Sequence, residues 1–504
     1  MKFVKIKNVI IACLGLSLIS SCSDDFFDVD SNGLMVENGY YQNEIQAFSA
    51  LTAVYDVVGW ETFVSRIAGL NAASDDFYVG GGSSTDVNEL QVWSIYTLNP
   101  SVGPQGEYWK KGYQGVYRAN TLLKKLPNVP MSQSKIDRFT AEAKSLRAYF
   151  YFDLVRFFGR IPLITQPLGP NEYYSVPQAA PEAVFAQIET DLLEAIPNLP
   201  TTIVASVEGG RMTQCAARAL LGRVYLWQNK FTLAAEQLAL VNGTPGAVSP
   251  YGNKLLANFS DLWNPANKYN AESIFEVSHS NVGNWSDWGN VAGSEGNILN
   301  QMVGPRNYDP LSATAPDYVS GYSFNPVTED LFNAFSNTDP RKKATIINMK
   351  QMVLDGTANY TPGYKDTGYF LEKFAGRASN RHIGGGAPEL NWNQNTYDIR
   401  LADTYLMEAE ALVRGGGDIG RAQGLLDAVR GRVNMPLIPA TEQNIFNERR
   451  LELAGEGHRW FDLIRTGRAA TVLSGRGFVA GTHEVLPIPL LELTNTLLTQ
   501  NPHY

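Results

Sequence analysis

Residues 445–468 read IFNERRLELAGEGHRWFDLIRTGR, and this stretch decides how the chain folds. It predicts two helices joined at a glycine break. Thr441 is a suitable N-cap for the first helix, and Gly455 lowers helix propensity after it. Helix resumes around Trp460, and Gly467 stands where a C-terminal capping glycine belongs. Acidic, basic and imidazole side chains are interleaved with bulky apolar ones throughout, so these charges must find partners.

Two interpretations of this charge density compete. Glu456 and His458 beside several arginines are compatible with an acid/base site, but catalytic groups usually converge from several segments. Here the charged groups sit on one helical run and can satisfy one another by spacing alone. We therefore expect a partly buried structural ion-pair network made of Glu448, Arg449, Arg450, Glu452, Glu456, His458, Arg459, Asp462 and Arg465.

The amino-acid composition limits the classes of protein to which this chain can belong. The 504 residues contain no long linker or charge run that would divide them, which favours one large domain. A net charge of −9 argues against nucleic acid as a partner, because phosphate binding needs a basic surface. The 24 tyrosines and 9 tryptophans exceed what the core requires, so we expect some aromatic rings to face a ligand.

The N-terminus has the layout of a bacterial lipoprotein signal. Lysines precede an apolar run over residues 9–19, and Ser20-Ser21-Cys22 follows, which resembles a lipobox. We expect residues 1–21 to be a signal peptide and acylated Cys22 to anchor the mature chain to a membrane. Cys215 is then the single remaining cysteine, so no internal disulfide is possible.

Helical periodicity recurs along the chain and predicts an all-α scaffold. Two helix pairs, 213–228 with 231–241 and 399–413 with a helix after Gly415-Gly416-Gly417, resemble tetratricopeptide units, whose apolar stripes need a stacked neighbour. Further helices are expected within 40–70 and over 109–126 and 142–158. Residues 244–398 lose helical period, so we interpret them as a long loop-rich excursion with at most a few short strands.

Motifs for cofactors and metals are weak. Gly415, Gly417 and Gly420 match the GxGxxG pattern, but a helix rather than a strand precedes them, so a tight turn is expected. Residues 28–39 begin like a calcium loop but end in Gly39 instead of glutamate. The five histidines show no pair at zinc spacing. The sequence therefore predicts no cofactor, no metal site and no catalytic residues.

Aromatic residues on irregular segments are the strongest candidates for ligand binding. A sugar ring presents an apolar face that stacks on an aromatic plane, and hydroxyls that polar side chains can bind. Each single ring could equally pack the excursion onto the helices. We take as candidates for glycan binding Asp75, Tyr78, Trp93, Asn99, Trp285, Trp288, Arg306, Tyr308 and Trp392, with Asn284, Asp287 and Asn290 as further polar neighbours.

Three parts of the chain resemble the SusD/RagB family of surface glycan-binding lipoproteins of Bacteroidetes outer membranes. They are residues 447–468, NERRLELAGEGHRWFDLIRTGR; residues 141–164, AEAKSLRAYFYFDLVRFFGRIPLI; and the LPIP and QNPHY segments near the C-terminus. One departure is Gly455, where members commonly carry an aromatic residue. The resemblance spans residues 22–504 and implies a single SusD-like domain, with an N-terminal part to about residue 240 and a C-terminal part from about residue 241.

The resemblance also implies a function. Members capture oligosaccharides or polysaccharides at the cell exterior and cover a SusC-like TonB-dependent transporter that imports them. The expectation is therefore a noncatalytic, lipid-anchored glycan-binding protein of the outer membrane. The alternative is a repeat scaffold that docks a membrane partner and binds no sugar itself.

Overall fold

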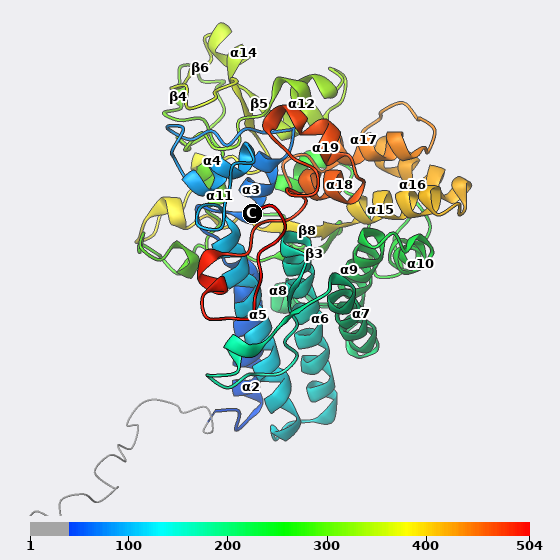
Figure 1. Ribbon diagram of the computed structural model, residues 1–504. Helices are drawn as coiled ribbons and strands as arrows, with labels where there is room; N and C mark the ends of the chain where they lie inside the picture. Colours follow the sequence, from blue (N-terminus) through cyan, green and yellow to red (C-terminus); the bar gives the residue numbers. More distant parts are fainter. Residues whose placement is uncertain (1–39) are drawn as a thin grey trace, which may run out of the picture.

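The computed structural model describes residues 40–504 (Figure 1). The predicted signal peptide, the acylation site Cys22 and the calcium-like segment 28–39 lie outside the described residues. Within residues 40–504, no helix is both long enough and apolar enough to cross a membrane.

The described chain is mainly helical, which confirms the predicted fold class. Its α-helices are α2 (Glu44–Gly59), α3 (Arg66–Ala73), α4 (Asn88–Ser94), α5 (Gln105–Lys125), α6 (Gln133–Phe158), α7 (Pro181–Ala195), α8 (Ala205–Glu208), α9 (Gln214–Trp227), α10 (Phe231–Asn242), α11 (Leu299–Met302), α12 (Glu329–Ala334), α13 (Arg341–Thr345), α14 (Met349–Leu354), α15 (Leu401–Arg414), α16 (Ile419–Arg432), α17 (Glu442–Glu452), α18 (Arg459–Arg465) and α19 (Ala469–Val472).

The strands are short and pair two by two in antiparallel fashion. The pairs are β1 (Ile161–Pro162) with β2 (Gln178–Ala179), β3 (Ser273–Val277) with β8 (Thr396–Arg400), β4 (Asp309–Pro310) with β6 (Ala358–Asn359), and β5 (Ile346–Asn348) with β7 (Tyr369–Leu371). Strand β8 leads directly into α15. The helix predicted from residue 399 therefore begins at Leu401, because Ile399 and Arg400 belong to the ladder with β3.

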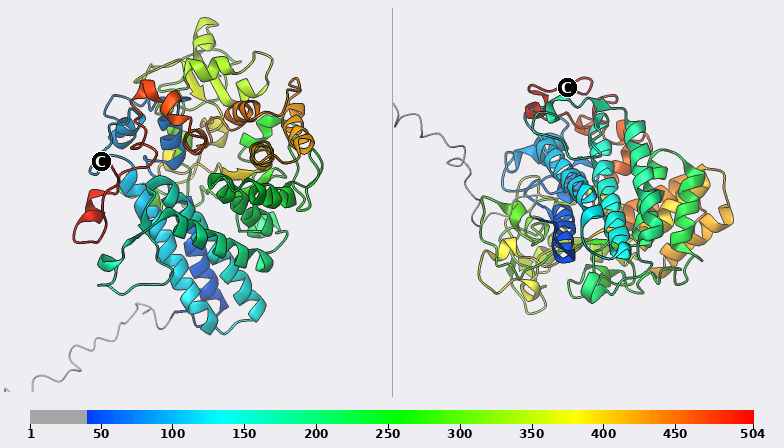
Figure 2. Two further views of the ribbon diagram at one scale, coloured as in Figure 1. Left: turned by 45° about the vertical axis from the view of Figure 1, so that its right-hand side comes forward. Right: turned by 90° about the horizontal axis from the view of Figure 1, so that it is seen from below.

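The two predicted helix pairs lie side by side although they are far apart in sequence. Helix α10 packs against its partner α9 on one side and against α15 on the other, and α15 packs against α16 (Figures 1 and 2). The approach of α9 to α10 is close, because a Cβ on Gly222 would lie 2.6 Å from Cγ of Leu238. The scattered repeats thus form one stack, which buries the apolar stripes that neither pair could bury alone.

Helices α2, α5 and α6 form a second group, at the lower end of Figure 1. Small residues on α5 allow the approach of α6: a Cβ on Gly115 would lie 2.3 Å from the ring of Phe150. The buried face of α2 includes Ala47 and Leu51, which are fully buried, whereas Ile45 is 77% exposed. Helix α6 also begins nine residues before the predicted start at residue 142.

Residues 244–398 form the predicted excursion, and its elements α12, α14, β4, β5 and β6 lie at the top of Figure 1. Their short elements are held to the C-terminal helices by charged side chains as well as by β3 and β8. Arg341 of α13 and Lys373, which follows β7, both reach carboxylates of the 445–468 stretch. The excursion is therefore fastened to the scaffold through this stretch.

Candidate functional site

The charged stretch at residues 445–468 forms a buried ion-pair network. Arg400 binds Glu452 and Glu456, and Arg341 binds Glu448 and Glu452, with every one of these side chains almost fully buried. Further pairs include those that join Arg449 to Asp403 and Asp462, Arg450 to Asp76 and Asp330, Arg459 to Asp75, and Arg465 to Glu410 and Asp462. The network connects α15, α17, α18, the excursion and the segment after α3.

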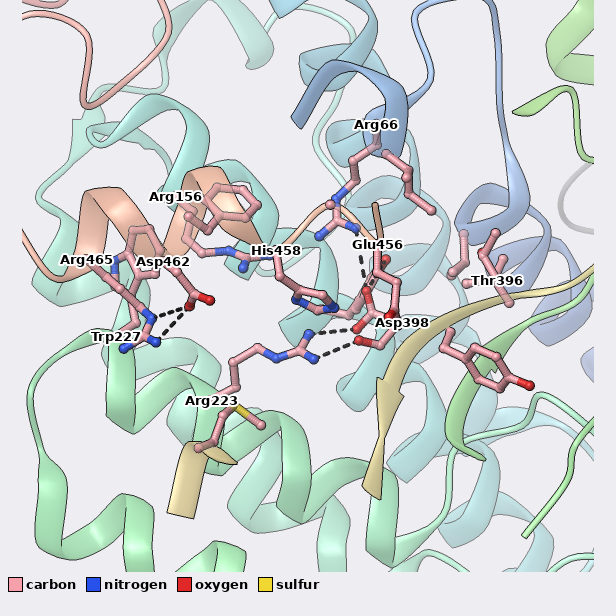
Figure 3. Close-up of a pocket in the computed structure, with 18 of the residues that line it drawn as sticks. Arg66, Arg156, Arg223, Trp227, Thr396, Asp398, Glu456, His458, Asp462 and Arg465 are labelled. Carbon is pink, nitrogen blue, oxygen red and sulfur yellow. Dashed lines mark hydrogen bonds and ion pairs between the residues drawn. The ribbon is translucent and has the colours of Figure 1, made fainter. Parts of the chain in front are cut away.

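The network surrounds a small cavity of about 40 Å³, shown in Figure 3. Arg223 donates to Asp398 from one side of the cavity, and Arg465 donates to Asp462 from the other. Burial lowers the pKa of His458 to about 4, so this imidazole is neutral near pH 7. The cavity has room for a few water molecules but not for a sugar ring. Glu456 and His458 therefore have no space for a carbohydrate substrate beside them.

Three of the predicted aromatic candidates lie in the protein interior. Trp93 and Trp392 are each 1% exposed, and Tyr308 is 8% exposed. Trp93 packs edge-on against Trp460 at 5.4 Å between ring centroids, and the hydroxyl of Tyr308 donates to the carbonyl of Pro316 at 2.7 Å. The expectation that these three rings face a ligand is wrong, because large apolar rings on loops are also what fastens a loop to a core.

Two polar candidates are occupied by structural contacts. Asp75 accepts two hydrogen bonds from Arg459, at 2.8 and 2.9 Å, and Arg459 holds the pKa of this carboxyl below its usual range despite burial. Asn99 accepts hydrogen bonds through Oδ1 from the backbone N–H groups of Ser101 and Val102 and so closes a turn. Asp75 therefore belongs to the ion-pair network, and Asn99 shapes a loop.

Tyr78 and Arg306 are each held by neighbouring side chains or backbone groups. Two cations lie near the ring of Tyr78, Lys365 at 5.2 Å and Arg476 at 5.0 Å from its centroid. Arg306 is 33% exposed at its side chain, donates to the carbonyl of Tyr322 and lies 3.9 Å from Asp86. Both side chains are half-buried and anchored by neighbours.

Trp285 and Trp288 are the candidates that build an exposed surface. The Trp288 side chain is 45% exposed, and its ring is parallel to that of Phe63, with 6.3 Å between centroids and 9° between planes. Trp285 is half-buried beneath the loop, and its indole N–H donates to the carbonyls of Asp287 and Asn290. Trp285 thereby holds the shape of the loop, and Trp288 presents its ring to solvent.

The 284–293 loop is held in place by later residues of the same excursion. Asn391 accepts from the N–H of Trp285 and donates to its carbonyl, at 2.9 and 2.7 Å. Nε2 of His382 lies 2.7 Å from Oδ1 of Asn284, whose φ of +50° is one that asparagine adopts more readily than most residues. A loop bonded at both backbone and side chains can present Trp288 in a fixed orientation.

A cleft of about 370 Å³ opens close to Trp288 and Phe63, which together we call the Trp288 platform. The two rings do not line this cleft, but Thr62 and Asn290, which lie within two residues of them in the chain, do, so we call it the Trp288 cleft. It lies between the segment after α2, the first turns of α5 and the 284–293 loop, and it is lined by Trp60, Glu61, Thr62, Lys110, Asn290 and Gly293 among others. Within the described residues, the side chains of Lys110 and Asn290 make no hydrogen bond or ion pair with the protein. An aromatic platform next to free polar groups is the surface chemistry that sugars require.

Sequence reasoning missed Phe63 and Trp60, which complete this site. Both follow α2 in a short segment whose sequence, WETFVS, was included in the region predicted to contain the first helix. Trp60 lies under Arg118 at 5.0 Å, and its indole N–H donates to Asp56. The available signal was the aromatic pair itself, since Trp60 and Phe63 stand outside the apolar stripe of the helix.

Comparison with known proteins identifies the relatives of this chain. A family model described as "SusD family" matches residues 271–504, and one described as "Starch-binding associating with outer membrane" matches residues 25–226. The chain is similar to a solved structure described as a laminarin-binding SusD-like protein, with 53% identity, coverage of 92% of this chain and 100% of that chain, and a TM-score of 0.89.

Two further relatives are less similar in sequence. Surface glycan-binding protein A from Bacteroides thetaiotaomicron, solved in complex with laminarihexaose, is 28% identical over 91% of this chain and 99% of its own, with a TM-score of 0.81. SusD-like protein P25 from Formosa agariphila is 26% identical over 97% of each chain. The motifs, the helical fold and these similarities lead to one conclusion: the chain belongs to the SusD/RagB family.

Proposed function

We propose that this protein binds a neutral oligosaccharide of the laminarin type on the Trp288 platform and in the adjoining cleft. The observation that carries the proposal is the exposed ring of Trp288, which lies parallel to the half-buried ring of Phe63 and two residues from the side chain of Asn290, which is unpaired within the described residues. The 53% identity to a laminarin-binding SusD-like protein supports the choice of ligand class. Trp285, Trp288 and Asn290 are the residues proposed to bind or to shape the site.

The proposed cellular role is capture and delivery, without catalysis. Acylation at Cys22 would hold the chain on the exterior face of the outer membrane, and a SusC-like TonB-dependent transporter would receive the glycan. The absence of a catalytic role is supported by the size of the cavity around Glu456 and His458, which leaves no room for a substrate there. Incubation of the protein with a bound polysaccharide should then release no reducing ends.

Titration of the mature chain by calorimetry and tryptophan fluorescence tests the proposal. Laminarihexaose should bind and perturb the emission of an exposed indole, whereas a xylan oligosaccharide of similar length serves as a comparison for specificity. If no glycan in a broad panel of plant, host and microbial polysaccharides produces heat or a fluorescence change, the alternative role as a sugar-free docking scaffold is favoured.

A further inference from the structure

A second groove, of about 440 Å³, opens on another side of α5. Its walls are α5, the segment 162–173 and the C-terminal segment 492–498, which lie beside one another in Figures 1 and 2. Lys110 lines both this groove and the Trp288 cleft. The two openings therefore flank the same helix.

The floor of the groove is fixed by hydrogen bonds from α5. The hydroxyl of Tyr113 donates to the carbonyl of Pro162 at 2.9 Å, and the amide of Asn120 donates to the carbonyl of Ile164 at 2.8 Å. On the other side, Trp109 and Glu492 line the groove, and burial raises the pKa of the Glu492 carboxyl. Segments far apart in the sequence are thus held at a set spacing across the groove.

The rim of the groove carries exposed rings and unpaired polar groups. Tyr117 and Tyr173 are 45% and 43% exposed. Their hydroxyls, and the side-chain amides of Gln114 and Gln166, have no hydrogen-bond partner within residues 40–504. Aromatic faces combined with free amides and hydroxyls suit a ligand that is apolar on its faces and hydroxylated at its edge.

The charge of the groove points to a neutral ligand. Its lining contains one cation, Lys110, and one anion, Glu492, so neither an anionic nor a cationic polymer is favoured. Large aliphatic side chains that a protein partner would cover, Leu491 at 85% and Leu497 at 59% exposure, stand outside the lining. The groove itself therefore matches carbohydrate better than a protein surface.

We propose that the groove between α5 and the C-terminal segment is a second oligosaccharide subsite, with Tyr117 and Tyr173 as its stacking residues. The inference rests on the proposed function, since it takes the same ligand class as the Trp288 cleft. A long glucan chain that occupies both openings has a higher affinity for the protein than it has for either opening alone. Once one end is bound, the binding of the other end is intramolecular.

The test compares a short and a long ligand on the full mature chain. Calorimetry with laminarihexaose should give two sites on the wild-type protein and one site on the Tyr117→Ala/Tyr173→Ala variant. Binding of polymeric laminarin, measured by affinity electrophoresis, should weaken by about tenfold in this variant. Tyr174→Ala is the matched control, because Tyr174 is 56% exposed and does not line the groove.

The outcomes separate this inference from the proposed function. A single hexaose site that is lost in Trp288→Ala and unchanged in the double tyrosine variant overturns the second subsite and leaves the proposed function intact. No binding of any glucan overturns both. Co-purification of the transporter is also measured with the double tyrosine variant and with Leu491→Ser/Leu497→Ser. If both variants reduce this co-purification while each still binds hexaose at two sites, the groove is a protein-docking surface and the inference is wrong. A folded far-UV spectrum is required of each variant.

Discussion

Arg400 and Glu456 form a bidentate contact in the protein interior. Nε of the guanidinium donates to Oε2 of Glu456 and Nη2 donates to Oε1, each at 2.8 Å. Arg400 is the last residue of β8, and Glu456 lies in the glycine break between α17 and α18. The contact therefore joins the excursion's ladder to the C-terminal helices, at a point where both side chains are almost fully removed from water.

Replacement of Glu456 by alanine should destabilise the fold strongly. Arg400 and Lys373 would each lose a buried counter-charge, a change that typically costs about 3–5 kcal/mol of unfolding free energy. The measurement is urea denaturation followed by circular dichroism. Glu194→Ala is the control, since its pair with Lys144 is largely exposed and worth about 0–1 kcal/mol. Equal urea midpoints for the two variants would contradict the prediction.

Gly455→Ala should also destabilise the protein. Gly455 has a φ of +82°, and a Cβ there would lie 2.4 Å from Cδ1 of Leu371, so both backbone strain and a steric clash oppose any side chain. We expect a loss of about 1–3 kcal/mol in the free energy of unfolding. Gly431→Ala, in α16 with no atom within 4 Å of the added Cβ, should leave stability unchanged or slightly higher. Thermal melts of both variants decide the point.

Stability should fall as the pH drops from about 6.5 to about 4. Burial lowers the pKa of folded His458 to about 4, whereas an unfolded histidine titrates near 6.5, so the unfolded state binds the extra proton in this window. The neutral imidazole faces Asp403, Arg223, Glu456 and Arg449.

A His458→Asn variant isolates this contribution. Between pH 7 and pH 5 the wild type should lose about 2 kcal/mol more than the variant, as measured by urea midpoints at each pH. If the two proteins lose stability in parallel as the pH falls, the pKa of His458 does not differ between the folded and unfolded states in this range.

Trp288→Ala should weaken laminarihexaose binding at the cleft by about tenfold or more, because it removes the exposed ring that stacks on the sugar face. Trp288→Phe should retain part of the affinity. Val282→Ala is the control in the same region, since Val282 is 77% exposed and has no role in the proposed site. If Trp288→Ala binds laminarihexaose with unchanged affinity, the sugar binds elsewhere on the protein and the proposed site is wrong.

Cys22→Ser should release the protein from the membrane. The proposed anchor is a lipid on the Cys22 thiol, so the variant should neither incorporate labelled palmitate nor sediment with membranes. Wild-type protein expressed in the same cells is the reference. Membrane attachment of the variant would mean that another part of the chain, or a partner, holds it there.

The sequence was sufficient to predict most of the helical scaffold. Thr441 accepts a hydrogen bond from the N–H of Asn444 as an N-cap, and Gly467, which follows the C-cap Thr466 of α18, has a φ of +69°. Such signals are local, so they can be recognised without knowing the fold. The start of α15 could not be located in this way, because whether Ile399 is helical or extended depends on its partner Phe275 in a distant strand.

Local sequence patterns are enough to identify the class of the molecule: a helical chain, a family signature and a stretch whose charges had to be paired. Which aromatic rings face solvent depends instead on how distant segments pack. Trp93, Trp288 and Trp392 look alike in sequence, each on an irregular or short segment, yet only Trp288 is exposed. The reason is physical: burial of a loop ring depends on what distant segments bring against it, and Trp460 covers Trp93 while Phe63 leaves one side of Trp288 open.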